Sequence, residues 1–201
     1  MDDKEREQAL LTALTTEHFA LQTSRGATIA ESVGRATVFL TLLSASLVGL
    51  GFVSTSGELL RPYLAAVLPT LVVTGLLTFF RLVQNMVENS LSLQRLQRIR
   101  GFYHRQFGGG HDFFADAATD EDVARAAWRA VGGTPGRFQL LLTTAAMIGA
   151  VNALLLGASV TLLLALVIGS AMAITVGVLV VLLAFAAQFW WITRSSISHA
   201  T

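Results

Sequence analysis

Residues 138–193 have the sequence FQLLLTTAAMIGAVNALLLGASVTLLLALVIGSAMAITVGVLVVLLAFAAQFWWIT, which contains no Asp, Glu, Lys, Arg or His over 56 residues. One helix needs about 20 apolar residues to cross the roughly 30 Å hydrocarbon core of a bilayer. The stretch is too long for one crossing, and it predicts two membrane-spanning helices joined by a tight turn. We place the turn near residues 168–170 (IGS), and a turn near residues 157–159 (GAS) is the alternative.

Two shorter uncharged runs, residues 36–56 and 62–80, come earlier in the chain. Charged residues make up 13% of the whole sequence, against about 25% in soluble domains. This composition excludes an ordinary soluble domain. The sequence therefore predicts an all-α integral membrane protein with four transmembrane helices, arranged as a first hairpin over 36–80 and a second over 138–193.

The arginines and the single lysine predict the orientation of the chain. Thirteen basic residues fall in segments 1–35, 81–137 and 194–201, and one, Arg61, falls in the loop after the first span. Basic residues accumulate in cytoplasmic loops. We therefore expect these three segments and both termini to be cytoplasmic. Thirteen of the fourteen basic residues are Arg, a composition typical of high-GC bacteria, so the predicted location is a bacterial inner membrane.

Helical patterns extend from the first hairpin into the predicted cytoplasmic segments. Residues 3–35 lack Pro and place Glu17, Glu31 and Arg35 on one helix face. This face is either a solvated surface with a Glu31–Arg35 ion pair or the polar vestibule of an oligomer. The second span is predicted to continue past Arg81 as a long helix. Its apolar stripe needs a cover, which the N-terminal helix of the same or a neighbouring subunit would supply, so we expect a homo-oligomer.

Basic residues concentrate near the end of this second helix, at Arg95, Arg98, Arg100 and Arg105. They form either a solvated face that follows the positive-inside bias or a site for an anionic ligand or lipid headgroup. Farther along, residues 119–122 (TDED) resemble a capping box, and they predict a short helix over 122–131.

The predicted spans carry uncharged polar residues but no ionisable ones. Intramembrane charges mark proton relays and ion-coupled sites, so their absence argues against a proton-coupled exporter. Thr70, Thr74 and Thr78 follow Pro69 at four-residue intervals. Their hydroxyls either bond back to their own helix or line a path for ions or small solutes. Asn152 in the third span either bonds to another helix or lines the same path.

The sequence offers no catalytic motif, no paired acids at bilayer depth and no metal or cofactor site, so we do not expect an enzyme. Its net charge of +1 argues against nucleic-acid binding. We therefore predict a homo-oligomeric channel or regulated pore, with membrane lipid and copies of itself as partners. The alternative is a non-conducting scaffold or accessory subunit that binds another membrane protein. A substrate-specific transporter ranks third.

Two stretches resemble a group of uncharacterised multi-pass membrane proteins of high-GC bacteria: TTEHFALQTSRGATIAESVGRA at 15–36 and GTPGRFQLLLTTAAM at 133–147. This resemblance implies a membrane protein and assigns no functional residue. More loosely, a cytoplasmic helix followed by two spans and a long cytoplasmic helix is similar to bacterial transmembrane effectors of nucleotide-signalled defence systems. Those effectors are thought to form pores, so this second resemblance agrees with the predicted pore.

Overall fold

The computed structural model describes residues 2–107, 140–165 and 167–197. Of these residues, 94% are helical and none forms a strand. Each of the four helices contains an apolar segment long enough to cross a membrane, as the sequence predicts. The helices are α1 (Asp3–Val53), α2 (Gly57–Phe107), α5 (Thr144–Ala165) and α6 (Ser170–Ile197).

Helix α1 runs without a break from the polar N-terminal segment through the first apolar run. A capping box starts it: the Asp3 N–H donates to the Asp2 carboxylate at 2.7 Å, and the Asp2 N–H donates to Glu5 Oε2 at 2.9 Å. These bonds satisfy N–H groups that the first helical turn leaves free. With 51 residues, α1 is about 76 Å long. This is more than twice the thickness of a bilayer core.

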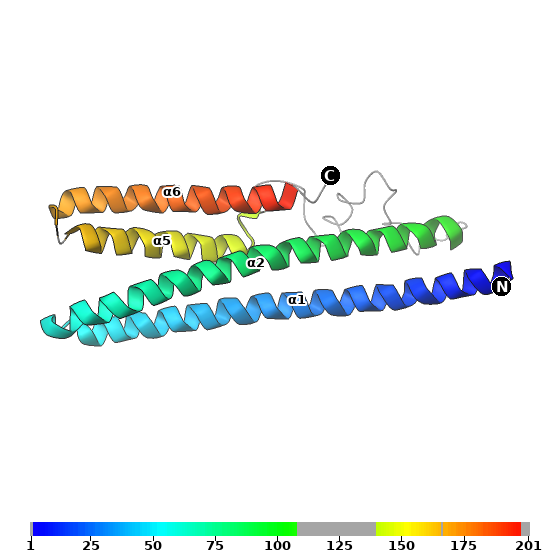
Figure 1. Ribbon diagram of the computed structural model, residues 1–201, viewed down its shortest axis with the longest axis horizontal. Coiled ribbons are helices and arrows are strands. Elements are labelled where there is room, and N and C mark those ends of the chain that lie inside the picture. Colours follow the sequence, from blue (N-terminus) through cyan, green and yellow to red (C-terminus); the bar gives the residue numbers. More distant parts are fainter. Residues whose placement is uncertain (1, 108–139, 166, 198–201) are drawn as a thin grey trace.

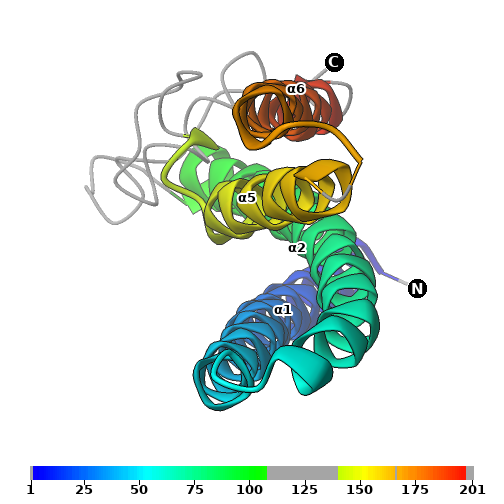
Figure 2. The ribbon, with the colours of Figure 1, turned by 90° about the vertical axis from the view of Figure 1, so that its left-hand side faces the viewer.

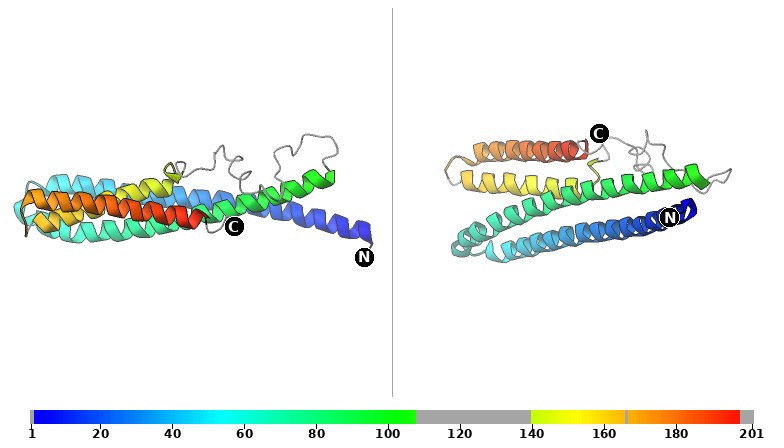
Figure 3. Two further views of the ribbon diagram at one scale, coloured as in Figure 1. Left: turned by 90° about the horizontal axis from the view of Figure 1, so that it is seen from above. Right: turned by 45° about the vertical axis from the view of Figure 1, so that its right-hand side comes forward.

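A three-residue connection, residues 54–56, reverses the chain into α2, which also has 51 residues. The Tyr63 hydroxyl of α2 donates to the Ser46 carbonyl of α1 at 2.7 Å beside this connection. Helices α1 and α2 therefore lie antiparallel along their length (Figure 1). Figure 3 shows from two further directions that both helices continue well beyond the ends of α5 and α6.

The second hairpin turns between Ala165 and Ser170, and α5 is unbroken through residues 157–159. The turn thus lies at the first of the two positions considered from the sequence. Helix α5 begins at Thr144, later than the predicted start of the hairpin at residue 138. Thr143 explains this start, because its hydroxyl accepts a hydrogen bond from the Ala146 N–H at 3.2 Å and so caps the helix.

The four helices form an open row rather than a closed bundle. Helix α1 packs on α2, α2 packs on α5, and α5 packs on α6 (Figure 2). Every helix contributes at least one buried side chain to the shared core, and the largest of these are Phe39, Phe79, Ile148 and Ile192. Because the row is open, large apolar side chains remain exposed on all four helices. A lipid bilayer or other membrane helices would cover these side chains.

Glycines allow α5 and α6 to approach closely. A Cβ atom at Gly157 would overlap the Val181 side chain, and one at Gly177 would overlap the Thr161 hydroxyl. Small residues play this part in membrane helix pairs, because association there depends on close van der Waals contact.

We expect Gly157→Val to lower the free energy of unfolding by about 1–3 kcal/mol, because the added side chain forces the hairpin apart. Unfolding in detergent with increasing dodecyl sulfate, followed by tryptophan fluorescence, measures the change. Gly51→Val is the control, because nothing lies within 4 Å of a Cβ atom at Gly51. Equal effects of the two substitutions would contradict the close approach at Gly157.

Candidate functional site

The polar halves of α1 (residues 3–35) and α2 (residues 81–107) lie against each other through both polar and apolar contacts. Leu21 of α1 packs with Leu96 and Ile99 of α2. Side-chain hydrogen bonds also join these two helices, among them Arg25 to Asn89 at 2.9 Å, Asn85 to Ser32 at 3.0 Å, and Thr15 with Tyr103 at 3.1 Å. The apolar stripe of α2 is therefore covered by α1 of the same chain. This stripe no longer provides an argument for assembly between chains.

A cluster of charges joins α1 to α2 next to the apolar segments. The guanidinium of Arg81 donates from Nε to Glu31 Oε1 and from Nη2 to Glu31 Oε2, both at 2.9 Å. Arg35 Nε donates to Glu31 Oε1 at 2.7 Å. Hydrogen bonds from Arg81 and then from Arg35 lower the pKa of Glu31 to about 2. A two-point contact of this kind fixes the relative orientation of the two side chains and is also stronger than a single hydrogen bond.

Only part of the predicted vestibule comes together here. Glu31 and Arg35 form the expected ion pair, while Glu17 is exposed and lies about 21 Å farther along α1. Sequence reasoning missed Arg81 as the main partner of Glu31. A signal for this pair existed, because Glu31 and Arg81 lie 25 residues before and after Ser56. Two helices that run antiparallel from a turn at Ser56 bring such positions together.

Two of the buried amide side chains each pack on a glycine. Asn152 is 1% exposed and lies against Gly75 of α2, and neither of its amide atoms has a hydrogen-bond partner among the described residues. Gln188 of α6 lies against Gly149 in the same way, and its Oε1 also has no partner there. The interhelical hydrogen bond, one of the two alternatives considered for Asn152, is therefore not formed with any described residue. Asn152 is also closed off from the surface of the single chain.

The three threonines of α2 differ in their exposure. Thr70 is exposed and its hydroxyl donates to the Ala66 carbonyl at 2.8 Å, Thr74 is partly exposed, and Thr78 is 7% exposed. A four-residue step rotates by about 40° around a helix. The line of threonines therefore turns from the surface into the core. The single chain presents Thr70 and part of Thr74, but not Thr78, to a neighbour.

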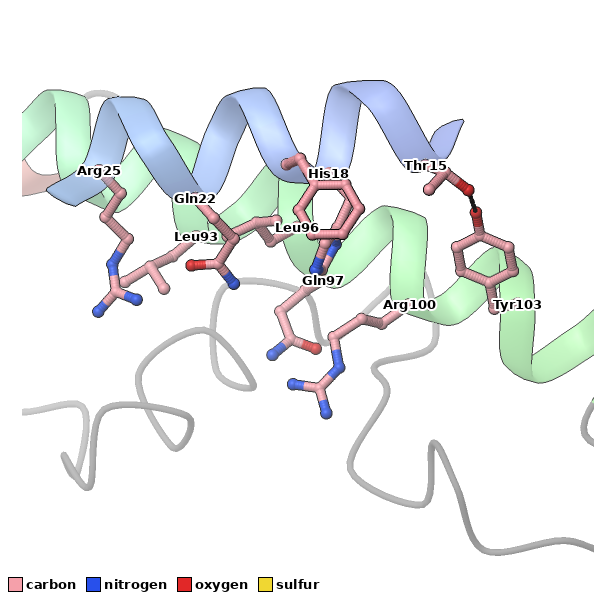
Figure 4. A pocket seen from close by; sticks show the side chains of 10 residues that line it. Thr15, His18, Gln22, Arg25, Leu93, Leu96, Gln97, Arg100 and Tyr103 are labelled. Carbon is pink, nitrogen blue, oxygen red and sulfur yellow. Dashed lines mark hydrogen bonds between the residues drawn. The ribbon is translucent and has the colours of Figure 1, made fainter. Parts of the chain in front are cut away.

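A groove of about 670 Å³ lies between the polar halves of α1 and α2 (Figure 4). Of the four predicted anion-binding arginines, Arg100 lines this groove, while Arg95, Arg98 and Arg105 are exposed elsewhere on α2. Sequence reasoning did not group Arg100 with residues of α1. The lining residues are Thr15, His18, Phe19, Gln22 and Arg25 from α1, and Leu93, Leu96, Gln97, Arg100 and Tyr103 from α2.

The short helix expected over 122–131 lies outside the described residues, as do residues 198–201 of the tail.

Comparison with protein-family models, with curated proteins and with solved structures finds no match to this chain. The resemblance to multi-pass membrane proteins of high-GC bacteria stays a prediction. The geometry of the chain itself is therefore the basis for a functional proposal.

The ion cluster predicts how the stability of the α1–α2 hairpin depends on pH. The pKa of Glu31 is about 2 in the folded chain, below its ordinary value of 4.5. Its stabilising effect is therefore complete above an ordinary carboxyl pKa and is lost as the pH falls toward 2. We expect Glu31→Gln to lower the unfolding midpoint at pH 7, and the difference from the unmodified protein to shrink below pH 4.5. Thermal unfolding in a neutral detergent between pH 7 and pH 3 measures this.

Glu17→Gln is the matched control for this experiment. Glu17 is an exposed acid on the same helix and forms no ion pair with any described residue. Its substitution should leave the midpoint nearly unchanged at every pH. A constant difference between Glu31→Gln and the unmodified protein across the whole pH range would contradict the role given to the cluster.

Proposed function

We propose that the chain is the subunit of a homo-oligomeric channel or regulated pore for ions or small solutes in a bacterial inner membrane, with both termini cytoplasmic. The open row of helices is the observation that supports this proposal. In the apolar segment of α1, Val38 and Phe52 are 67% and 77% exposed, and α2 is the main partner of this helix. A second copy of the chain would cover the side chains of this open edge.

The conducting path then runs between copies, along the exposed face of α2. Thr78 and Asn152 are buried inside one chain, which leaves Thr70 and Thr74 as the predicted pore-lining residues that a lumen between copies could reach. Hydroxyl oxygens can replace part of the hydration shell of a small ion or solute, and the predicted spans add no fixed charge to such a path. The excess of arginines in the segments beyond the spans supports the cytoplasmic orientation.

Substitution at Thr70 tests this path. We expect reconstituted protein to show discrete openings in a planar bilayer, and Thr70→Leu to change their unit conductance by about twofold or more, because a leucine narrows the path and removes an oxygen. Thr175→Leu is the matched control. Thr175 of α6 is also exposed, and its hydroxyl also donates to a carbonyl four residues earlier, that of Ala171, at 3.0 Å.

If Thr70→Leu and Thr175→Leu have the same unit conductance, the path does not run along α2. Absence of any opening across voltage and pH would contradict the pore itself. It would favour the alternative, a non-conducting scaffold or accessory subunit. One observation favours this alternative: neither Thr78 nor Asn152, the buried polar groups of the predicted path, reaches the surface of the single chain. The exposed Arg95 and Arg98 would then belong to its docking surface.

A further inference from the structure

The groove between the polar halves of α1 and α2 has the size and the lining of a ligand site. Its volume of about 670 Å³ falls in the range of roughly 300–1,000 Å³ that is typical of small-molecule pockets. None of its ten lining residues is Asp or Glu, and two are arginines, Arg25 and Arg100. We propose that this groove binds a small soluble organic anion that has a flat apolar body and a hydrogen-bond donor.

The two arginines reach the groove from different helices. Figure 4 shows the side chains of Arg25 and Arg100 pointing to the same side of the helix pair. Arg25 is oriented by the bond from its Nε to Asn89 Oδ1 at 2.9 Å. A guanidinium held in this way presents its remaining N–H groups as a fork that matches a carboxylate, phosphate or sulfonate. The His18 imidazole lines the groove as a further polar group.

Gln97 supplies the argument for a donor on the ligand. Its side chain is 2% exposed and lines the groove, yet its Oε1 has no hydrogen-bond partner among the described residues. Buried acceptors in folded proteins are nearly always paired. An N–H or O–H group on a bound molecule would satisfy this oxygen.

Apolar and aromatic side chains of the groove would contact the flat apolar body of the proposed ligand. Leu93 and Leu96 line the groove from α2, and Phe19 lines it from α1 while remaining 67% exposed. Tyr103 is held by the hydrogen bond that its hydroxyl shares with Thr15 (Figure 4). A ring placed among these side chains would bury apolar surface that water otherwise contacts.

The position of the groove argues for a soluble anion rather than a lipid headgroup. Arg25 lies ten residues before Arg35, where the apolar segment of α1 begins, and His18 lies 17 residues before it. At 1.5 Å per residue these are about 15 Å and 25 Å from the hydrocarbon. The headgroup layer on each side of a bilayer is only about 5–8 Å thick. The groove is thus beyond the reach of headgroups, and the proposal does not depend on whether the chain conducts.

Binding of 5-aminonaphthalene-1-sulfonate to the full chain in neutral detergent tests the proposal. This probe combines an anion, a flat ring and an amine donor, and its fluorescence reports binding. We expect the double substitution Arg25→Gln/Arg100→Gln to raise the dissociation constant of the probe by about tenfold or more, because charged hydrogen bonds to the anion are lost. The matched control Arg95→Gln/Arg98→Gln removes the same charge from exposed positions outside the groove, and it should bind as the unmodified protein does.

Gln97→Leu provides a second, independent variant. The unmodified protein should bind the amine probe more tightly than naphthalene-1-sulfonate, which lacks the donor, and Gln97→Leu should remove this preference. Equal affinity of the two double-arginine variants would overturn the site. Loss of probe binding in nanodiscs of phosphatidylglycerol, but not of phosphatidylcholine, would show that lipid headgroups occupy the groove, and it would overturn the choice of a soluble ligand.

Discussion

The three-residue connection at residues 54–56 sets the antiparallel register of α1 and α2, and the contacts between their polar halves depend on this register. Because both helices are continuous, residues at similar distances from the connection meet far away from it. Glu31 meets Arg81, Arg25 meets Asn89, and the groove forms still farther along. A shift of one residue in either helix would rotate its side chains by about 100° and would separate these pairs.

The sequence was sufficient to predict the helices, but not which residues of neighbouring helices meet. An uncharged run of about 20 residues can cross a bilayer only as a helix or within a barrel, and this predicted the four apolar helices and the turn before Ser170. The long polar halves followed from the absence of breaking residues. Spacing shows which residues share a helix face, but not which face a second helix covers. For this reason the contact of Arg81 with Glu31, the burial of Thr78 and the groove that Arg25 and Arg100 both line were not predicted.

Two buried amides, Asn152 and Gln188, each occupy the space that a glycine leaves on a neighbouring helix. Asn152 fits over Gly75, and Gln188 fits over Gly149. Both amide atoms of Asn152 and Oε1 of Gln188 have no hydrogen-bond partner among the described residues. Burying such atoms is costly in an apolar environment, so these residues do not act as simple filling. Their shape and the glycine hollows together favour one alignment of α5 with α2 and of α6 with α5. These buried amides would lower the stability of the fold but favour a single packing of the helices.

The length of α1 has a mechanical consequence. From Glu31, at the edge of the apolar segment, to Asp3 the helix continues for 28 residues, or about 42 Å. Because α2 packs on this half of α1 as far out as Thr15, the two helices would move together as a lever. A tilt of about 5° at the charge cluster would displace the far end of the pair by about 4 Å. The reverse holds as well: a modest sideways force on the remote end becomes a torque at the membrane boundary. At that boundary, the hydrogen bonds from Arg35 and Arg81 to Glu31 would resist this torque.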